Sequence, residues 1–306
     1  MTFYHICLIL QTGTILDIIL CGKEWKMDTG VILILTHAGE INVGKIISHL
    51  RDTGQKVLRV NTDEFSQNKP VFNLSLSGSV LSGSLKTGSF TLDLGNVKSV
   101  WYRRAAKFKM AETGQLSKEE KDFIESETRA TLWSLYSTLD CFWMNRPLQA
   151  VNLLEQNKLL QMKIASSTGL ITPKTLVSND AKELTGFAEG LGGEVVVKVV
   201  CSRIFQENHL SWGIYTNKVS AEALREHEND VALAPLMAQE YIPKKFELRI
   251  TVVGSKIFAC AIYSQNSKKT KDDWRHYDFD NVPHEPYELP EEIKNKLLQF
   301  MKKAGL

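Results

Sequence analysis

Apolar positions near the start of the chain follow a strand period, then a helix period, then a strand period again. Residues 31–35 are an uninterrupted apolar run, and residues 57–60 are another. Between them, residues 40–51 carry apolar side chains at the spacing of one helix face: Val43, Ile46, Ile47 and Leu50. Gly54 marks the end of this helix. The order predicts a βαβ unit, and therefore a parallel sheet.

The next pattern is a series of short strands followed by one long helix. Apolar residues alternate with Ser, Gly and Thr over residues 71–94, which predicts short antiparallel strands, and residues 97–103 read as a further strand. Ser117 and Glu120 form a capping box that opens a helix to about Leu139. Because the last turns of this helix are apolar, we expect that end to be buried, against a second subunit on one interpretation.

The second half again mixes helices and strands. Gly169 and Pro173 end a helix, and Asn179 and Asp180 cap another. We expect helices over 154–167, from 181 and from 297 to 306, and strands over 175–178, 195–200, 247–253 and 257–262. The whole chain is therefore of the α/β class.

Two short motifs in the first half have a functional and a plain interpretation. The segment 39–46 nearly matches a phosphate-binding P-loop, but Ile46 lacks the hydroxyl that binds Mg²⁺ and fits the apolar helix stripe, so burial explains it. Arg103 and Arg104 follow Trp101 and Tyr102 at a strand end. They are suited to a carboxylate or a phosphate, or they form a surface cation pair.

Lys198 is the most informative single residue of the second half. It stands among five valines: Val195, Val196, Val197, Val199 and Val200. An unpaired ammonium group is costly to bury, so an apolar strand tolerates it with an anionic partner or at an opening. Lys198 is a candidate phosphate ligand; the alternative is an edge position from which the side chain reaches water.

Three further segments suit a ligand. Glu240, Tyr241 and Ile242 end an apolar run and could line an adenine ring, or they are an ordinary strand end. Glu247 and Arg249 lie two residues apart in a strand, so their side chains share one face. Glu247 would suit ribose hydroxyls and Arg249 an anionic substrate, or the two residues take part in a cross-strand salt bridge. A mobile, charged segment, residues 268–273, precedes Trp274 and Arg275, and such a run is most often a solvated loop.

Composition narrows the class of protein. The 306 residues suggest two domains, and the net charge of +2 favours neither nucleic acid nor an anionic membrane as a partner. Five scattered cysteines without paired spacing indicate free thiols in a reducing cytoplasm. Residues 1–26 are apolar but too short and interrupted for a membrane span. We interpret them as an extension that is poorly ordered or wrongly included, or alternatively as a weak membrane or export signal, and Met27 is a second candidate start.

Several of these fragments, in this order, resemble the ATP-grasp maturases that form ester and amide macrocycles in ribosomal peptides, the microviridin-type or graspetide synthetases. The resemblance covers residues 31–306. It rests on the segments 61–63, 101–104, 157–161, 173–180, 239–242 and 273–275.

The resemblance implies a pre-ATP-grasp α/β domain over residues 27–146 and an incomplete two-subdomain ATP-grasp fold over 147–306. It implies that nucleotide is bound by Lys158, Lys198, Glu240, Tyr241, Ile242 and Glu247. Phosphates would contact the two lysines, adenine the residues 240–242, and ribose Glu247. Arg249 and Arg275 would bind the substrate carboxylate or the transferring phosphate in catalysis.

The reaction implied is ATP-dependent activation of a Glu or Asp side chain of a precursor peptide as an acyl phosphate, followed by attack of a Ser, Thr or Lys side chain. The cofactors would be ATP and Mg²⁺, and the partner a precursor peptide with a leader segment; a homodimer is expected from the family alone. Two alternatives remain: a ligase adding an amino acid to a small molecule or protein tail, and an inactive peptide-binding remnant.

No metal ligand is predicted within the sequence. The resemblance places the Mg²⁺ ligands after Leu306, the last residue. A fragment, a frameshifted product or an inactive relative is therefore expected.

Overall fold

Two compact units make up the chain in the computed structural model, which describes residues 5–7, 30–65, 70–88, 90–106, 108, 116–147, 154–155, 157–200, 204–207 and 210–306. The first unit combines Met1–Gly13 with Asn152–Leu306, and the second is Thr14–Val151. Each unit contains its own sheets and apolar cores.

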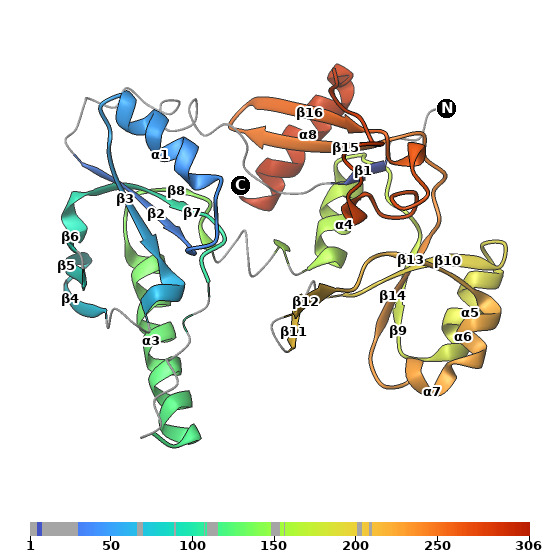
Figure 1. Cartoon of the computed structure of the whole chain (residues 1–306), viewed down its shortest axis with the longest axis horizontal. Coiled ribbons are helices and arrows are strands. Elements are labelled where there is room, and N and C mark those ends of the chain that lie inside the picture. Colours follow the sequence, from blue (N-terminus) through green and yellow to red (C-terminus); the bar gives the residue numbers. More distant parts are fainter. Residues whose placement is uncertain are drawn as a thin grey trace. The chain divides into compact units, whose positions relative to one another are not determined.

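The second unit is built on a parallel sheet (Figure 1). Its strands are β2 (Val31–Thr36), β3 (Lys56–Asn61), β7 (Val97–Tyr102) and β8 (Phe142–Met144), in the order β3-β2-β7-β8, and all pair in parallel. The predicted βαβ unit is confirmed. Its helix, α1 (Val43–Asp52), begins three residues later than expected, because Glu40 accepts hydrogen bonds from the backbone and side chain of Asn42.

An antiparallel meander and a long helix cover the other face of this sheet. The meander consists of β4 (Val71–Ser77), β5 (Val80–Thr87) and β6 (Phe90–Asp93), as predicted. Ser117 and Glu120 form the expected capping box of α3 (Lys118–Thr138). The apolar end of α3 packs on the chain's own core through Leu132, Leu135 and Tyr136, so a second subunit is not needed to bury it. Short 3-10 turns at Thr62–Glu64 and Leu94–Asn96 complete the unit.

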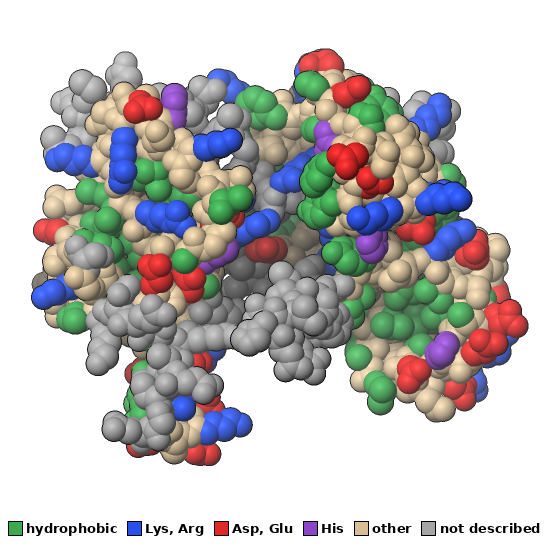
Figure 2. All heavy atoms as spheres, viewed as in Figure 1, with side chains coloured by type: hydrophobic (Ala, Val, Ile, Leu, Met, Phe, Trp, Pro, Cys, Tyr) green, Lys and Arg blue, Asp and Glu red, His purple; other side chains and the backbone are tan. Residues whose placement is uncertain are grey.

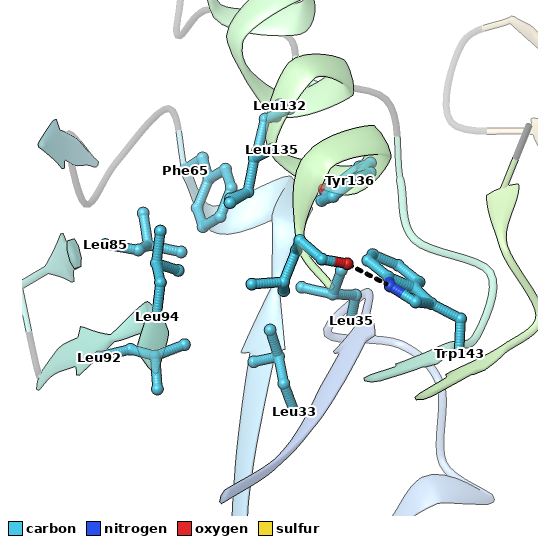
Figure 3. A pocket seen from close by; sticks show the side chains of 11 residues that line it. Leu33, Leu35, Phe65, Leu85, Leu92, Leu94, Leu132, Leu135, Tyr136 and Trp143 are labelled. Carbon is cyan, nitrogen blue, oxygen red and sulfur yellow. Dashed lines mark hydrogen bonds between the residues drawn. The ribbon is translucent and has the colours of Figure 1, made fainter. Parts of the chain in front are cut away.

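The core between α3 and the sheet contains one small void, shown in Figure 3. Leu33 and Leu35 come from β2, Leu85 and Leu92 from the meander, and α3 closes the other side. The Trp143 indole N–H donates to the Leu139 carbonyl at 3.2 Å, which satisfies the polar atom nearest this space. With about 10 Å³ and an apolar lining, the void is at the lower limit for one water and reads as a packing gap.

In the first unit, an antiparallel sheet carries helices on one face. Its order is β13 (Asn217–Ser220), β10 (Glu194–Lys198), β14 (Leu236–Glu240) and β9 (Thr175–Ser178). The helices α5 (Ala181–Glu189) and α6 (Ala221–Glu226) pack on it, followed by the short α7 (Glu228–Val231). Asp180 caps α5 by accepting from the N–H groups of Lys182 and Glu183, as predicted. A separate hairpin pairs β11 (Ile204–Glu207) with β12 (Leu210–Gly213).

A second sheet of this unit packs on the helices α4 (Lys158–Ser167) and α8 (Glu291–Ala304). Its order is β1 (His5–Cys7), β15 (Glu247–Val253), β16 (Lys256–Ile262) and β17 (His284–Pro286). The expected β15–β16 hairpin turns at Gly254, whose φ of 57° lies in the left-handed region. Two 3-10 turns, Ser264–Asn266 and Trp274–His276, lie in the connection from β16 to β17.

The first strand of that sheet comes from the segment predicted to be an extension. Only residues 5–7 of residues 1–26 are described, and they pair in parallel with Glu247–Arg249 of β15. Residues 5–7 therefore form one edge of the second sheet.

The start of α4 differs from the prediction. The helix begins at Lys158, because Asn157 accepts a hydrogen bond from the N–H of Leu160 and caps it there. Leu159, in the first turn of the helix, is 50% exposed. Ile164 and Ala165 instead contact the core.

Two cysteines lie within the described side chains, and both are free thiols, as expected. Burial raises the pKa of the Cys141 thiol to about 12, although Arg146 opposes the shift, so this thiol stays protonated at neutral pH. Cys7, Cys21 and Cys201 lie outside the residues whose side chains are described.

Acidic and basic side chains are interspersed on the face shown in Figure 2, in agreement with the small net charge. Within the described part of the chain, none of the helices combines the length and apolar character needed to cross a bilayer.

The capping box of α3 gives a stability prediction. Replacing Ser117 by Ala removes the side-chain acceptor for the Glu120 N–H, and we expect a loss of about 1 kcal/mol in the free energy of unfolding. Ser137→Ala, at an exposed position of the same helix, is the matched control and should not destabilise. Urea unfolding followed by tryptophan fluorescence measures both; equal midpoints for the two variants would contradict the cap's contribution.

Candidate functional site

The candidate site is an open pocket in the first unit, where its two larger sheets meet. A cavity of about 60 Å³, open to solvent, lies against β10, the end of β14, the start of β15 and the segment 272–275. The lining residues are Pro173, Val196, Lys198, Thr216, Gln239, Glu240, Tyr241, Ile242, Lys244, Glu247, Asp272, Asp273, Trp274 and Arg275.

Lys198 lies on the wall formed by β10, as its place among valines predicted. It is the last residue of the strand and lines the pocket, while Val195 is fully buried on the α5 side. Lys158 does not line the pocket. Its ammonium group donates to the carbonyl of Val199, one residue beyond Lys198, so both lysines converge on the end of β10.

The predicted adenine-binding segment leaves its strand where the pocket opens. The Glu240 N–H donates to the Lys174 carbonyl at 3.0 Å, and the Glu240 carboxylate accepts from the Lys174 N–H at 3.2 Å. Pairing between β14 and β9 stops there, and Tyr241 and Ile242 continue along the pocket outside the sheet. This places main-chain donors and acceptors beyond the ladder, next to apolar side chains, as recognition of a purine edge requires.

The base of the pocket holds a buried ion pair. Glu247 Oε1 lies 2.8 Å from Lys244 Nζ, and both side chains are at most 7% exposed. The Ser264 hydroxyl also donates to Glu247 Oε1, at 2.9 Å. Lys244 further donates to the Asp272 carbonyl at 3.1 Å. The pair thus ties the β14–β15 connection to the segment before Trp274.

Arg249 lies on the same face of β15 as Glu247 but outside the pocket lining. The alternate residues Leu248 and Ile250 are buried against α4 and α8, which turns Glu247 and Arg249 to the opposite side. The Arg249 guanidinium lies 5.9 Å from the centre of the Trp274 ring, a cation–π arrangement. Trp274 therefore stands between Arg249 and the pocket residues beside it.

Arg275 is held by a buried carboxylate. Its Nε and one terminal nitrogen each donate to Asp273, both at 2.8 Å, in a bidentate pair. The Asp273 side chain also accepts from the N–H groups of Arg275 and Thr216. The Arg275 side chain is nevertheless 46% exposed.

The pairing with Arg275 lowers the pKa of the Asp273 carboxyl group. Burial alone raises the pKa of the carboxyl, but the hydrogen bonds and charge of Arg275, with the Thr216 N–H, outweigh it. The pKa of Asp273 therefore lies below its ordinary value of 3.8. The carboxylate is charged throughout the neutral range.

The sequence did not predict the roles of Lys244 and Asp273, the two side chains that hold Glu247 and Arg275 in place. Lys244 had no predicted role, and Asp273 counted only as part of the segment 273–275, because a partner distant in sequence cannot be identified from residue spacing. The charged segment before Trp274 is also more firmly attached than the mobile loop expected. Thr270 is fully buried and donates to the Ser264 carbonyl at 2.7 Å.

Metal ligands are not gathered in the part of the chain that the structure describes. Those residues contain no group of three or more His, Cys, Asp or Glu side chains that could hold an ion.

The comparisons with known proteins agree on one group of similar proteins. Residues 31–151 match the model of the MvdD pre-ATP grasp domain. The fold matches a RiPP-associated ATP-grasp ligase of Chryseobacterium gregarium, in complex with ADP and a leader and core peptide, with a TM-score of 0.80 and 27% identity over 90% of this chain and 82% of that one. In this domain and in its fold, the chain is similar to the RiPP-associated ATP-grasp ligases. The resemblance seen in the sequence is thereby confirmed.

Two macrocyclases of Microcystis aeruginosa MRC are also similar to this chain. MdnC, bound with the precursor peptide MdnA, shares 28% identity and a TM-score of 0.75, and MdnB shares 27% and 0.71. Both matches cover 90% of this chain and 84% of the other. A comparison with curated protein sequences found no match.

The Asp273–Arg275 pair gives a pH prediction for this ligase. Because the folded-state pKa of Asp273 is depressed, its charge stabilises the fold above about pH 4, and that contribution is lost as the pH falls through the folded-state value. We expect Asp273→Asn to cost about 1–3 kcal/mol at pH 7, with the difference from the unmodified protein shrinking below pH ~4.

The control is Asp272→Asn, which changes an exposed neighbour. Its difference from the unmodified protein should be small at every pH. Urea unfolding at a series of pH values measures all three proteins. A cost of Asp273→Asn that stays constant into acid would mean that the carboxylate's charge is not what the pair depends on.

Proposed function

We propose that this chain is an ATP-dependent carboxylate ligase that forms ester or amide side-chain crosslinks in a ribosomally made precursor peptide. The observation that carries the proposal is the pocket itself: an extended hinge, a lysine at the end of a valine strand and an outward arginine line one open space. The similar ligase holding ADP with leader and core peptide, and MdnC holding MdnA, support this choice of ligands.

The nucleotide is assigned to the pocket by chemistry. The backbone of Tyr241 and Ile242 suits the adenine edge, since its groups lie beyond the strand ladder. Glu240, the last residue of β14, lines the pocket beside them. Lys198 suits the phosphates, and Lys158, anchored on the carbonyl next to it, adds positive charge at the same strand end. Glu247, already accepting from Lys244 and Ser264, keeps its second oxygen for ribose hydroxyls.

The acceptor side of the pocket is assigned to Arg275, with Arg249 behind Trp274. A peptide carboxylate oxygen would attack the γ-phosphorus of ATP, forming an acyl phosphate and releasing ADP. A Ser or Thr hydroxyl, or a Lys amine, would then attack the acyl carbon, lose its proton and expel phosphate. Catalysis of this type is mostly positioning and charge stabilisation, which fixed guanidinium and ammonium groups supply.

Two further parts of the proposal come from the resemblance. The partner is a precursor peptide with a leader segment, and the protein acts as a cytoplasmic homodimer. Mg²⁺ would supply charge neutralisation of the phosphates when bound. The described residues do not form a magnesium site, and no residue of this chain is assigned to that ion.

Nucleotide binding is tested by thermal stabilisation. ATP with Mg²⁺ at 100 times its dissociation constant should stabilise the unmodified chain by about 2.7 kcal/mol. Lys198→Ala should lose most of this shift, because the phosphates lose their ammonium partner. Lys182→Ala, which removes an exposed lysine of α5, should keep it. A shift of the same size in all three proteins would place the nucleotide elsewhere.

The role of Arg275 is tested by Arg275→Lys, which keeps the charge but cannot form a bidentate pair. We expect ATP stabilisation to be retained and crosslinking to fall by about tenfold or more, the effect of losing one positioned charge contact. The measurement is the loss of one water mass from the precursor peptide MdnA, by mass spectrometry. Crosslinking unchanged in the variant would remove Arg275 from the acceptor site.

A further inference from the structure

The carboxyl edge of the parallel sheet in the second unit carries an arginine pair that the proposed reaction does not use. β2 continues into α1 on one face of the sheet, whereas the chain after β7 leads to α3 on the other face. The two adjacent strands therefore separate at their carboxyl ends. In open α/β sheets, this is the place where a crevice for a ligand forms.

Both loops at this point are fixed in place. Arg59 of β3 donates to the carbonyl groups of His37 and Ala38, at 2.9 and 3.2 Å. Asp63 accepts from the N–H of Ala38 with both carboxylate oxygens, each at 3.1 Å. On the β7 side, the N–H of Arg103 donates to the Leu35 carbonyl at 2.8 Å, which continues the strand pairing beyond Tyr102.

One buried carboxylate lies between the two loops. Glu40 is 3% exposed, and its Oε2 lies 3.5 Å from Arg103 and 3.7 Å from Arg104. Its other oxygen accepts from Asn42. Burial opposes ionisation, but Arg103, Asn42 and Arg104 together lower the pKa of Glu40, so it is charged at neutral pH. One carboxylate thus faces two guanidinium groups, at distances longer than a charge-assisted hydrogen bond.

Arg104 turns toward solvent at this edge. Its side chain is 54% exposed, and its backbone φ of 50° is in the left-handed region, uncommon for a residue other than glycine. Ile41, on the facing loop, is 84% exposed. An outward guanidinium beside an exposed apolar side chain suits a peptide better than a small inorganic anion.

The start of α1 adds to the positive field. Its first turn contains the exposed Lys45 and no acidic residue, although the partial positive charge of a helix N-terminus favours acids there. Thr36, the last residue of β2 and on the α1 side by strand alternation, is fully buried, and its hydroxyl has no hydrogen-bond partner among the described residues. An anion bound at this edge would offset both features.

We propose that the edge formed by Glu40, Ile41, Lys45, Arg103 and Arg104 is a binding site for a carboxylate side chain of the peptide substrate. The proposal rests on the proposed function for its ligand class, an acidic peptide. Arg104 makes the main contact, Ile41 packs against the peptide chain, and Glu40 holds both guanidinium groups from beneath while competing for them.

The test compares two fluorescein-labelled synthetic peptides, one of alternating Glu and Thr and one with Gln in place of each Glu. Fluorescence anisotropy at low ionic strength, without nucleotide, gives both dissociation constants. The unmodified chain should prefer the Glu peptide by about fivefold or more, the effect of an exposed ion pair. Arg104→Gln should abolish the preference, and Arg104→Lys should retain part of it.

Two further variants sharpen the result. Glu40→Gln removes the competing charge at constant shape and should tighten binding of the Glu peptide, opposite to Arg104→Gln. Arg51→Gln, at an exposed arginine in the last turn of α1, should leave the preference intact. Circular dichroism confirms that each variant is folded.

A preference that survives Arg104→Gln, or its absence in the unmodified chain, would overturn the proposal. Displacement of both peptides equally by inorganic phosphate would overturn it too, in favour of a small-anion site. The assay contains no nucleotide, so its failure is separate from a failure of ATP stabilisation, which would instead refute the nucleotide pocket.

Discussion

The ion pair between Lys244 and Glu247 is the constraint on which the pocket depends. Both groups are buried, so each needs the other, and removing one would leave an uncompensated charge at a cost of about 3–5 kcal/mol. Because Lys244 also holds the Asp272 carbonyl, the pair joins the hinge, the start of β15 and the segment leading to Arg275. The second buried carboxylate, Asp273, then orients Arg275 from within the protein. The walls of the site are thus fixed by charges that do not need to touch a ligand.

The same arrangement recurs in the second unit, where Glu40 lies beneath Arg103 and Arg104. In each case a buried acid contacts a guanidinium group whose side chain stays partly exposed, Arg275 in the first unit and Arg104 in the second. This reduces the conformational freedom that the arginine would lose on binding an anion. The arginine attracts an anion less strongly in return, because the buried carboxylate offsets part of the guanidinium charge.

Local sequence patterns predicted most elements of the fold, because period and caps are local properties. The strand at 31–35, the capping box at Ser117 and the Asp180 cap are examples. The errors arose where a side chain overrides the period: Asn157 delays the start of α4, and Glu40 that of α1. Among the site residues, Lys198 could be predicted from the valines around it. Most other site residues were predicted only from the resemblance to a family, which rests on several motifs in a fixed order. The partners Lys244–Asp272 and Asp273–Thr216 could not be predicted, because they join segments distant in sequence.

The parallel pairing of β1 with β15 has a consequence for biosynthesis. His5 pairs with Glu247, so the two strands are separated by about 240 residues, with the second unit encoded between them. During synthesis, β1 leaves the ribosome long before β15 has been made, and the whole second unit emerges between them. Since closing so long a loop is entropically costly, we expect this sheet edge to assemble last, after synthesis has passed β15.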